Sequence, residues 1–169
     1  MIYIALGSNL PSARFGAPLD TLNAAVDAIE RSGIHVVKHS RWYRSPAYPP
    51  SDQPDFVNGV IAVETLLPPA ALLTRLHAIE ASFGRERQEQ NAARTLDLDL
   101  IAYDDVACAG ADNEPALPHP RMVGRAFVLR PLQDIAPDWR HPLTGETISA
   151  LIAALPPDQR AEVLENGAK

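Results

Sequence analysis

Two aspartates stand two residues apart in the stretch RTLDLDL, which runs from Arg94 to Leu100 and alternates polar with apolar residues. This alternation predicts a half-buried β-strand, in which residues i and i+2 point to the same face. Asp97 and Asp99 are therefore expected side by side, where like charges repel and raise the pKa of one carboxyl group. A cation should lie between them, either a Lys or Arg side chain from elsewhere or a bound metal.

Arginines and a histidine cluster around this pair along the chain. The cluster comprises Arg85, Arg87, Arg94, His119, Arg121 and Arg125. Two carboxylates with several arginines are typical of a polyphosphate site, because Mg²⁺ combines carboxylates with phosphate oxygens and guanidinium groups bind the remaining oxygens. A solvent-exposed face held by salt bridges explains the same pattern. On this pattern alone, both interpretations stay open.

The usual nucleotide-binding loops are absent from the sequence. It contains neither a G-x-x-x-x-G-K-[ST] loop nor a G-x-G-x-x-G turn, which excludes a P-loop and a Rossmann site. No Ser-His-Asp order or nucleophile elbow is present, which disfavours covalent catalysis. If ATP binds, side chains and metal ions must hold it.

A second group of residues suits a flat heterocyclic ring. It consists of Asn9, Phe56, Asn58 and Phe127. An asparagine amide offers a donor and an acceptor to the edge of such a ring, and aromatic side chains stack on its faces. The alternative is that these residues are core aromatics and turn asparagines, which is the commoner role of each residue type.

Length and composition limit the protein class. The 169 residues are most simply one domain, covering residues 1–169. The net charge of −6 argues against general affinity for nucleic acid or an anionic membrane, and no apolar run approaches the roughly 20 residues of a membrane span. The N-terminus lacks the basic start of a secretory signal, and a single cysteine, Cys108, excludes an internal disulfide. We therefore expect a soluble, cytoplasmic protein.

Hydrophobic periodicity predicts the elements that must position these residues. Strands are expected at residues 2–7, 34–44, 56–64 and 96–103, and helices at 18–31, 68–84 and 147–154. Four prolines make residues 45–55 a stiff loop, residues 84–93 form a polar loop, and the last dozen residues are expected to fray. The order strand, helix, strand, strand, helix, strand is the split βαβ pattern of an α+β, ferredoxin-like antiparallel sheet, here with extra C-terminal elements. This fold hosts many functions and does not decide the activity.

Four segments of the chain together resemble one enzyme family. They are YIALGSNL, YRSPAYPPSDQPDFVNGV, IEASFGRER with RTLDLDLI, and LPHPRMVGRAFVLRPLQDIAP, in family order over about residues 3–137. The chain resembles the 6-hydroxymethyl-7,8-dihydropterin pyrophosphokinases of folate biosynthesis, also named 2-amino-4-hydroxy-6-hydroxymethyldihydropteridine diphosphokinases. The RTLDLDL and QPDFVN pieces are specific to that family.

The resemblance implies a reaction and its partners. The β,γ-pyrophosphoryl group of ATP passes to the hydroxymethyl group of the dihydropterin, which releases AMP. Two Mg²⁺ ions enter with ATP and are held by Asp97 and Asp99. Such a displacement depends mainly on positioning and charge stabilisation. ATP and the dihydropterin are then the partners, and the protein is expected to be a monomer.

The family motifs also imply a role for each matching residue. Arg85 and Arg94 match loop arginines that act in catalysis. The ATP site is matched by His77, Glu80, Arg87, His119 and Arg125. The pterin site is matched by Asn9, Ala47, Tyr48, Phe56, Asn58 and Phe127, with the two phenylalanines on either side of the ring. Residues 45–55 and 84–93 match loops that close over the substrates and exclude water.

The chain departs from the family pattern at several positions. In RERQEQNAAR, residues Gln90, Asn91 and Ala93 replace positions that in many members include a further arginine and an aromatic residue or proline. Phe56 replaces a tyrosine of some members, which keeps ring stacking but loses a hydroxyl. Two alternatives stay open: a related enzyme that acts on a modified pterin, and a non-catalytic ferredoxin-like module that binds a nucleotide or a protein partner.

Overall fold

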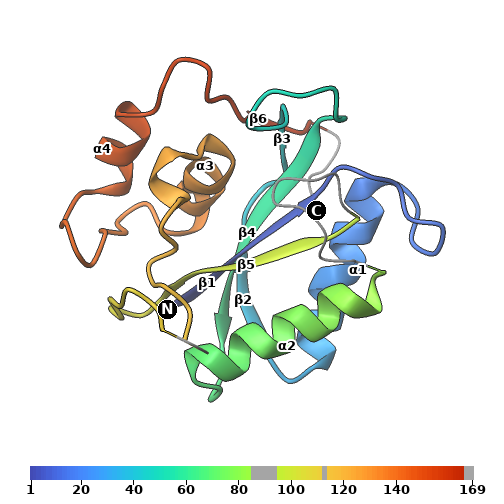
Figure 1. Ribbon diagram of the computed structural model, residues 1–169, viewed down its shortest axis with the longest axis horizontal. Coiled ribbons are helices and arrows are strands. Elements are labelled where there is room, and N and C mark those ends of the chain that lie inside the picture. Colours follow the sequence, from blue (N-terminus) through green and yellow to red (C-terminus); the bar gives the residue numbers. More distant parts are fainter. Residues whose placement is uncertain (85–94, 112–113, 166–169) are drawn as a thin grey trace.

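An antiparallel sheet organises the computed structural model, which describes residues 1–84, 95–111 and 114–165 (Figure 1). Within these residues the strands are β1 (Ile2–Ser8), β2 (His35–His39), β3 (Tyr43–Ser45), β4 (Phe56–Glu64), β5 (Asp97–Tyr103) and β6 (Glu162–Val163). They lie in the order β5-β1-β4-β3-β6, and β2 also pairs with β4. β5 is therefore an edge strand that pairs with β1.

Helices cover both faces of the sheet (Figure 1). α1 (Pro18–Arg31) and α2 (Pro69–Ser82) begin with proline, which suits the first turn because the N–H there has no partner within the helix. These two helices pack on one face, and α3 (Ala126–Ile135) with the short α4 (Ile148–Ala153) packs on the other. A 3₁₀ turn, Met122–Gly124, precedes α3. No helix in the described ranges is long and apolar enough to cross a membrane.

The order of the elements confirms the predicted fold class. The chain order β1, α1, β2, β4, α2, β5 and the spatial order β5-β1-β4-β2 together form the split βαβ arrangement. The protein thus has an α+β, ferredoxin-like fold, to which α3, α4 and β6 are added. The strands predicted at 2–7, 56–64 and 96–103 and all three predicted helices are confirmed with small shifts of their ends.

The sheet separates two hydrophobic cores. The larger core lies between the sheet and helices α1 and α2, and its members include Ile4, Leu6, Leu22, Leu76 and Leu98, each at most 2% exposed. The second core lies beneath α3 and α4 and contains Val60, Ala62, Ile101, Val128, Leu129 and Leu132. Burying one such aliphatic side chain stabilises the fold by roughly 1.5–3 kcal/mol. Alternate residues of the central strands therefore serve opposite cores.

Gly59 of β4 leaves room for the indole ring of Trp42. A Cβ atom on Gly59 would lie 2.6 Å from Trp42 Cε3 and Cζ3, which is closer than real contacts allow. Trp42 is 2% exposed and belongs to the larger core. Glycine is required at position 59 because the ring occupies the space of a side chain.

The single strand predicted at residues 34–44 is wrong, because the structure divides it into β2 and β3. At the break, the Val60 N–H donates to the Ser40 hydroxyl (2.9 Å), which in turn donates to the Arg41 carbonyl (2.7 Å). The Ser40 hydroxyl oxygen thus accepts the Val60 N–H bond that a backbone carbonyl would accept in a regular sheet. Hydrophobic alternation carries no signal for such an exchange.

The C-terminal part of the chain differs from the prediction in two further ways. The sequence does not predict α3 as a helix, since Pro131 within it removes one N–H donor and usually breaks a helix. The predicted fraying of the last dozen residues is wrong for those that the structure describes. Val163 of β6 pairs with Tyr43, and the Leu164 N–H donates to the Trp42 carbonyl (2.8 Å). Residues 166–169 lie outside the described residues.

Candidate active site

Asp97 and Asp99 lie at the start of β5, on the face of the sheet opposite Leu98 and Leu100. Both aspartates are partly exposed, while the two leucines are buried in the larger core. The same-face placement that the alternation predicts is therefore confirmed. Because β5 is an edge strand, the two carboxylates stand at the rim of the sheet.

The strand register brings Asp97 close to two residues predicted for the pterin site. Asp97 pairs with Gly7 of β1, and Gly7 pairs with Asn58 of β4. A Cβ atom on Gly7 would lie 3.0 Å from Asn58 Oδ1 and 3.9 Å from Phe56 Cδ1. Because Gly7 has no side chain, the side chains of Asn58 and Phe56 come close to β1 at the residue that pairs with Asp97.

His119 is attached to β5, because its backbone N–H donates to the carbonyl of Ile101 (2.8 Å). Arg121 follows two residues later, and Arg125 directly precedes α3. Both arginines act electrostatically on His119, and so does Asp97. The structure thus gathers the predicted carboxylate and two members of the basic cluster around one histidine.

The imidazole of His119 is neutral at pH 7. Its pKa is lowered to about 4, first by burial and then by Arg125 and Arg121, while Asp97 acts in the opposite direction. The Nδ1 atom accepts a hydrogen bond from the Arg121 backbone N–H (3.2 Å). The remaining ring proton is therefore on Nε2, which is a donor.

Arg125 and Phe127 stand at the start of α3, and the Arg125 Cζ atom lies 5.5 Å from the centre of the Phe127 ring. This is a cation–π distance. Phe127 also lines a cavity of about 230 Å³ together with Ala47 and Tyr48 of the proline-rich loop. Three residues predicted for the pterin site therefore share one cavity, and the arginine predicted for phosphate contacts its aromatic wall.

Two buried asparagines fix the loop and strand beside this cavity. Asn9 Nδ2 donates to Gln53 Oε1 and to the Pro54 carbonyl, both at 3.1 Å, which ties the proline-rich loop to the end of β1. Asn58 Nδ2 donates to Ser45 Oγ at 2.7 Å. Asn9 thus links the proline-rich loop to the end of β1, and Asn58 links β4 to β3.

Phe56 and Asn58 do not line the 230 Å³ cavity. Phe56 pairs with Ser45, which directly precedes the lining residue Pro46. The predicted sandwich of the pterin ring between Phe56 and Phe127 stays a prediction, since the two rings do not line this cavity together.

The two α2 residues predicted for the ATP site lie on the other face of the sheet. Glu80 is 1% exposed and His77 is half-buried, on a helix that packs opposite Asp97. The end of α2 nevertheless lies beside the start of β5, since Thr95 Oγ1 donates to the Phe83 carbonyl (3.2 Å). A ligand that contacts both groups must extend around the β5 edge.

Comparison with known proteins identifies the family of this chain. Residues 3–137 match the family model of 7,8-dihydro-6-hydroxymethylpterin-pyrophosphokinase. The chain belongs to this family. The matched range contains every residue predicted for the site, from Asn9 to Phe127.

Relatives in the pyrophosphokinase family cover most of the chain. A Synechocystis sp. protein named 2-amino-4-hydroxy-6-hydroxymethyldihydropteridine pyrophosphokinase is 45% identical over 150 residues, which are 88% of this chain and 73% of that one. The Pseudomonas aeruginosa protein of the same name is 44% identical over 158 residues, 92% and 91% of the two chains. A folic acid synthesis protein of Pneumocystis carinii is 38% identical over 149 residues, which are 88% of this chain but 19% of that protein.

In this pyrophosphokinase-family chain, Asp97 and Asp99 are carboxylates of the kind that binds Mg²⁺. Within residues 1–84, 95–111 and 114–165, no three His, Cys, Asp or Glu side chains form a group that could hold a metal ion. Mg²⁺ is commonly bound by one or two carboxylates together with water and substrate phosphates. The donor set therefore suits a metal that arrives with a polyphosphate.

Some residues of the predicted site lie outside the described residues. They are Arg85, Arg87 and Arg94, together with Gln90, Asn91 and Ala93, where the chain departs from the family pattern. Their roles in phosphate binding and loop closure stay predictions. Phe56, the remaining departure, is partly buried at the start of β4.

The sequence-based prediction of the site omits four residues that the structure brings to this region. Arg121 belongs to the basic cluster but is not among the predicted site residues, and the structure brings its charge to His119. The 230 Å³ cavity is also lined by Asp158, Gln159 and Arg160. These three residues lie in the stretch predicted to fray, and no local pattern marks them. Only the tertiary structure shows their contribution.

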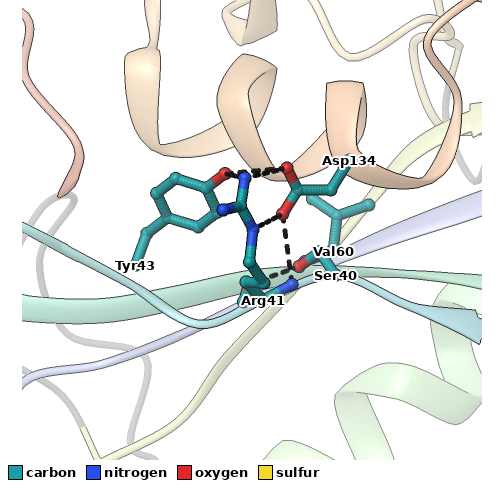
Figure 2. Close-up of polar contacts among 5 residues, drawn as sticks. All are labelled: Ser40, Arg41, Tyr43, Val60 and Asp134. Atoms are coloured by element: carbon teal, nitrogen blue, oxygen red, sulfur yellow. Dashed lines mark hydrogen bonds and ion pairs between the residues drawn. The ribbon is translucent and has the colours of Figure 1, made fainter. Parts of the chain in front are cut away.

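An ion pair fixes the far end of α3 to the sheet (Figure 2). Asp134 accepts hydrogen bonds from Arg41 Nε (3.0 Å), Arg41 Nη2 (2.7 Å) and Tyr43 Oη (2.9 Å). Burial raises the pKa of the Asp134 carboxyl, but these hydrogen bonds outweigh burial and lower it. Burial, and next the bond to Asp134, raise the pKa of Tyr43 to about 12. At neutral pH the Asp134 carboxyl group is therefore ionised and the Tyr43 hydroxyl keeps its proton.

Proposed function

We propose that this protein transfers the β,γ-pyrophosphoryl group of ATP to 6-hydroxymethyl-7,8-dihydropterin, giving AMP and the pterin diphosphate in folate biosynthesis. The main support is the placement of Asp97 and Asp99 at a sheet edge beside His119, in a chain of this family. The proposal includes one domain over residues 1–169, acting as a monomer in the cytoplasm.

The proposed reaction is a single displacement at phosphorus. The hydroxymethyl oxygen of the pterin forms a bond to the β-phosphorus of ATP, while the bond from that phosphorus to the α,β-bridging oxygen breaks. AMP leaves with the bridging oxygen, and the hydroxyl proton passes to solvent. Holding the two substrates in line supplies most of the rate in such a reaction.

Asp97 and Asp99 would hold the Mg²⁺ ions, two in this proposal, that accompany ATP. Mg²⁺ neutralises phosphate charge and lowers the pKa of a hydroxyl that coordinates it. The backbone that carries the two aspartates is held in place, because β5 is hydrogen-bonded to β1 and its leucines are buried in the larger core.

The remaining phosphate contacts come from the residues around His119. Its Nε2–H donates to a phosphate oxygen without bringing a charge, and Arg125 supplies a cation beside it. Arg85, Arg87 and Arg94 complete this set in the proposal. His77 and Glu80, on the other face, suit the nucleoside of an ATP molecule that bends around the β5 edge.

The pterin ring is assigned to the region between Phe127 and Phe56. Phe127, Ala47 and Tyr48 line the cavity. Asn58 and Asp97 pair with the same residue of β1, Gly7, from the two neighbouring strands. Asn9 acts by holding the proline-rich loop. The hydroxymethyl group then lies toward β5, where the metal-bound phosphates are proposed.

Product analysis with substitutions at the aspartates tests this proposal. Incubation with ATP, Mg²⁺ and the dihydropterin should yield AMP and no ADP. Asp97→Asn and Asp99→Asn should each slow AMP formation at least about a hundredfold, because metal positioning contributes several kcal/mol. Asp105→Asn makes the same change in the exposed turn that follows β5 and should leave the rate unchanged. Thermal denaturation of each variant verifies that the fold is intact.

Other outcomes identify the alternatives. ADP formation contradicts the proposed reaction, and full activity of both aspartate variants contradicts the metal assignment. AMP formation with only a modified pterin identifies a related enzyme. Calorimetric binding of an ATP analogue without any turnover identifies a non-catalytic module.

A further inference from the structure

The start of α3 lacks a cap from its own segment. Arg125 occupies the N-cap position, and no side-chain hydrogen bond caps the helix there. The first N–H groups of a helix have no partner within the helix, and an arginine side chain offers no acceptor. Ser, Thr, Asp or Asn normally fills this position.

A glutamine from the C-terminal segment supplies the missing acceptor. Gln159 Oε1 accepts a hydrogen bond from the Ala126 backbone N–H at 3.0 Å. Ala126 is fully buried and Gln159 is 9% exposed, so water is a poor substitute for this bond. Ala126 lies between Arg125 and Phe127, the two residues of α3 that the proposed site uses.

The segment that carries Gln159 is itself fixed to the sheet. The Gln159 N–H donates to the Pro156 carbonyl (3.0 Å), and β6 pairs with β3 through Val163 and Tyr43. Gln159 also lines the 230 Å³ cavity together with Phe127. The acceptor is thus held by contacts other than its own hydrogen bond to α3.

From this geometry we infer that Gln159 is a positioning residue, which sets the start of α3 and thereby the placement of Phe127 and Arg125 against the substrates. An acceptor delivered from outside the helix leaves the N-cap position to an arginine, whose charge the site needs. A cap from residue 125 itself would replace that guanidinium by a short polar side chain. The inference rests on the proposed function, since it is that proposal which gives Phe127 and Arg125 their contacts with the substrates.

Three variants separate positioning from general stability. Gln159→Leu keeps the approximate size but removes the acceptor, and Gln159→Glu keeps an acceptor and adds a negative charge that a helix N-terminus favours. Gln133→Leu makes the same change on α3, at a partly buried residue that does not bond Ala126. The KM for the dihydropterin, kcat and the melting temperature are measured for each protein, with kinetics at a temperature where all are folded.

We expect Gln159→Leu to raise the pterin KM about tenfold, which corresponds to about 1.4 kcal/mol. Gln159→Glu should stay within about twofold of the wild-type KM, and Gln133→Leu should match the wild type. A lower melting temperature of Gln159→Leu with unchanged kinetic constants overturns the inference, because it indicates a purely structural role. Equal loss in Gln159→Leu and Gln159→Glu overturns it as well.

If Gln159→Leu does not fold, Gln159→Asn takes its place, because it keeps the amide but withdraws the oxygen by one methylene group. A raised pterin KM in Gln159→Asn then supports the inference, and an unchanged KM overturns it. Failure of the wild type to form AMP counts against the proposed function. Equal KM values in an active wild type and an active Gln159→Leu count against the positioning role alone.

Discussion

His119 combines two properties that suit a neutral phosphate-binding group. Its ring orientation is set by the bond from the Arg121 N–H to Nδ1, and its proton is on Nε2. Because the pKa is far below neutrality, the donor does not change its charge across the physiological range. In the proposed reaction, this histidine would then not take the proton from the pterin hydroxyl.

The depressed pKa gives a test at this residue. In the metal-free protein we expect His119 to titrate at about 4, which NMR of labelled imidazole groups measures. The unfolded chain binds this proton near pH 6.5, whereas the folded chain binds it only near 4. The free energy of unfolding should therefore fall as pH decreases from 6.5 to 4, by about 1.4 kcal/mol for each pH unit at most.

His119→Gln serves as the control, because it removes this titration. The pH dependence of its unfolding should be flatter than that of the wild type between pH 4 and 6.5. Titration of His119 near its ordinary pKa of 6.5 would contradict the burial that the structure shows.

Single residues differ in how far their roles can be read from sequence. Alternation places Asp97 and Asp99 correctly on one face, because a strand alternates with period two whatever surrounds it. Gln159 falls in the end predicted to fray, since its importance comes from Ala126, 33 residues earlier in the chain. A contact of that separation leaves no local pattern.

Among the elements, α3 follows Arg125 and carries Phe127 of the predicted site, and it is held at both ends. Gln159 holds its start, and the Asp134 ion pair with Arg41 holds its end (Figure 2). Sequence patterns do not predict this helix because it contains Pro131, although that proline is buried within it. The local penalty of a proline is offset by burial of α3 against the sheet, which periodicity around residue 131 does not reveal.

Asp134→Ala tests how firmly α3 is held. Asp134 is 15% exposed on its side chain and accepts bonds from Arg41 and from the buried Tyr43 hydroxyl. Removing the carboxylate leaves the Tyr43 hydroxyl without this acceptor, so we expect a loss of about 1–3 kcal/mol in the free energy of unfolding. Denaturation in urea measures the loss.

Arg41→Ala is the matched comparison on the other side of the ion pair. Its side chain is 59% exposed, so water replaces much of the interaction and the loss should be smaller than that from Asp134→Ala. A loss from Arg41→Ala that equals or exceeds the loss from Asp134→Ala would show that the burial argument is wrong.

For the whole molecule, the sheet separates the larger core from the side on which we propose that the pterin binds. The core with α1 and α2 lies behind Asp97 and Asp99, while the core with α3 and α4 lies on their side (Figure 1). The fold class is predictable because it follows from the order of strongly periodic elements. The sequence does not predict which core lies on the side of Asp97 and Asp99, because that depends on which helix covers which face of the sheet.

Two leucines test this division. Leu22 of α1 and Leu129 of α3 are both 0% exposed, in opposite cores. Changing either to Ala should cost about 2–5 kcal/mol in the free energy of unfolding. Only Leu129→Ala should also raise the pterin KM, because α3 carries Phe127. Equal KM changes in both variants, measured well below their melting temperatures, would contradict the separation.

Gly59 and Trp42 restrict the order in which this sequence is able to change. Any other residue at position 59 drives a Cβ atom into the indole ring, which lies 2.6 Å from that point. Replacing Trp42 by a smaller side chain first removes the clash, at the cost of a cavity in the larger core. A lineage that exchanges both residues one at a time must therefore pass through loss of the tryptophan before loss of the glycine.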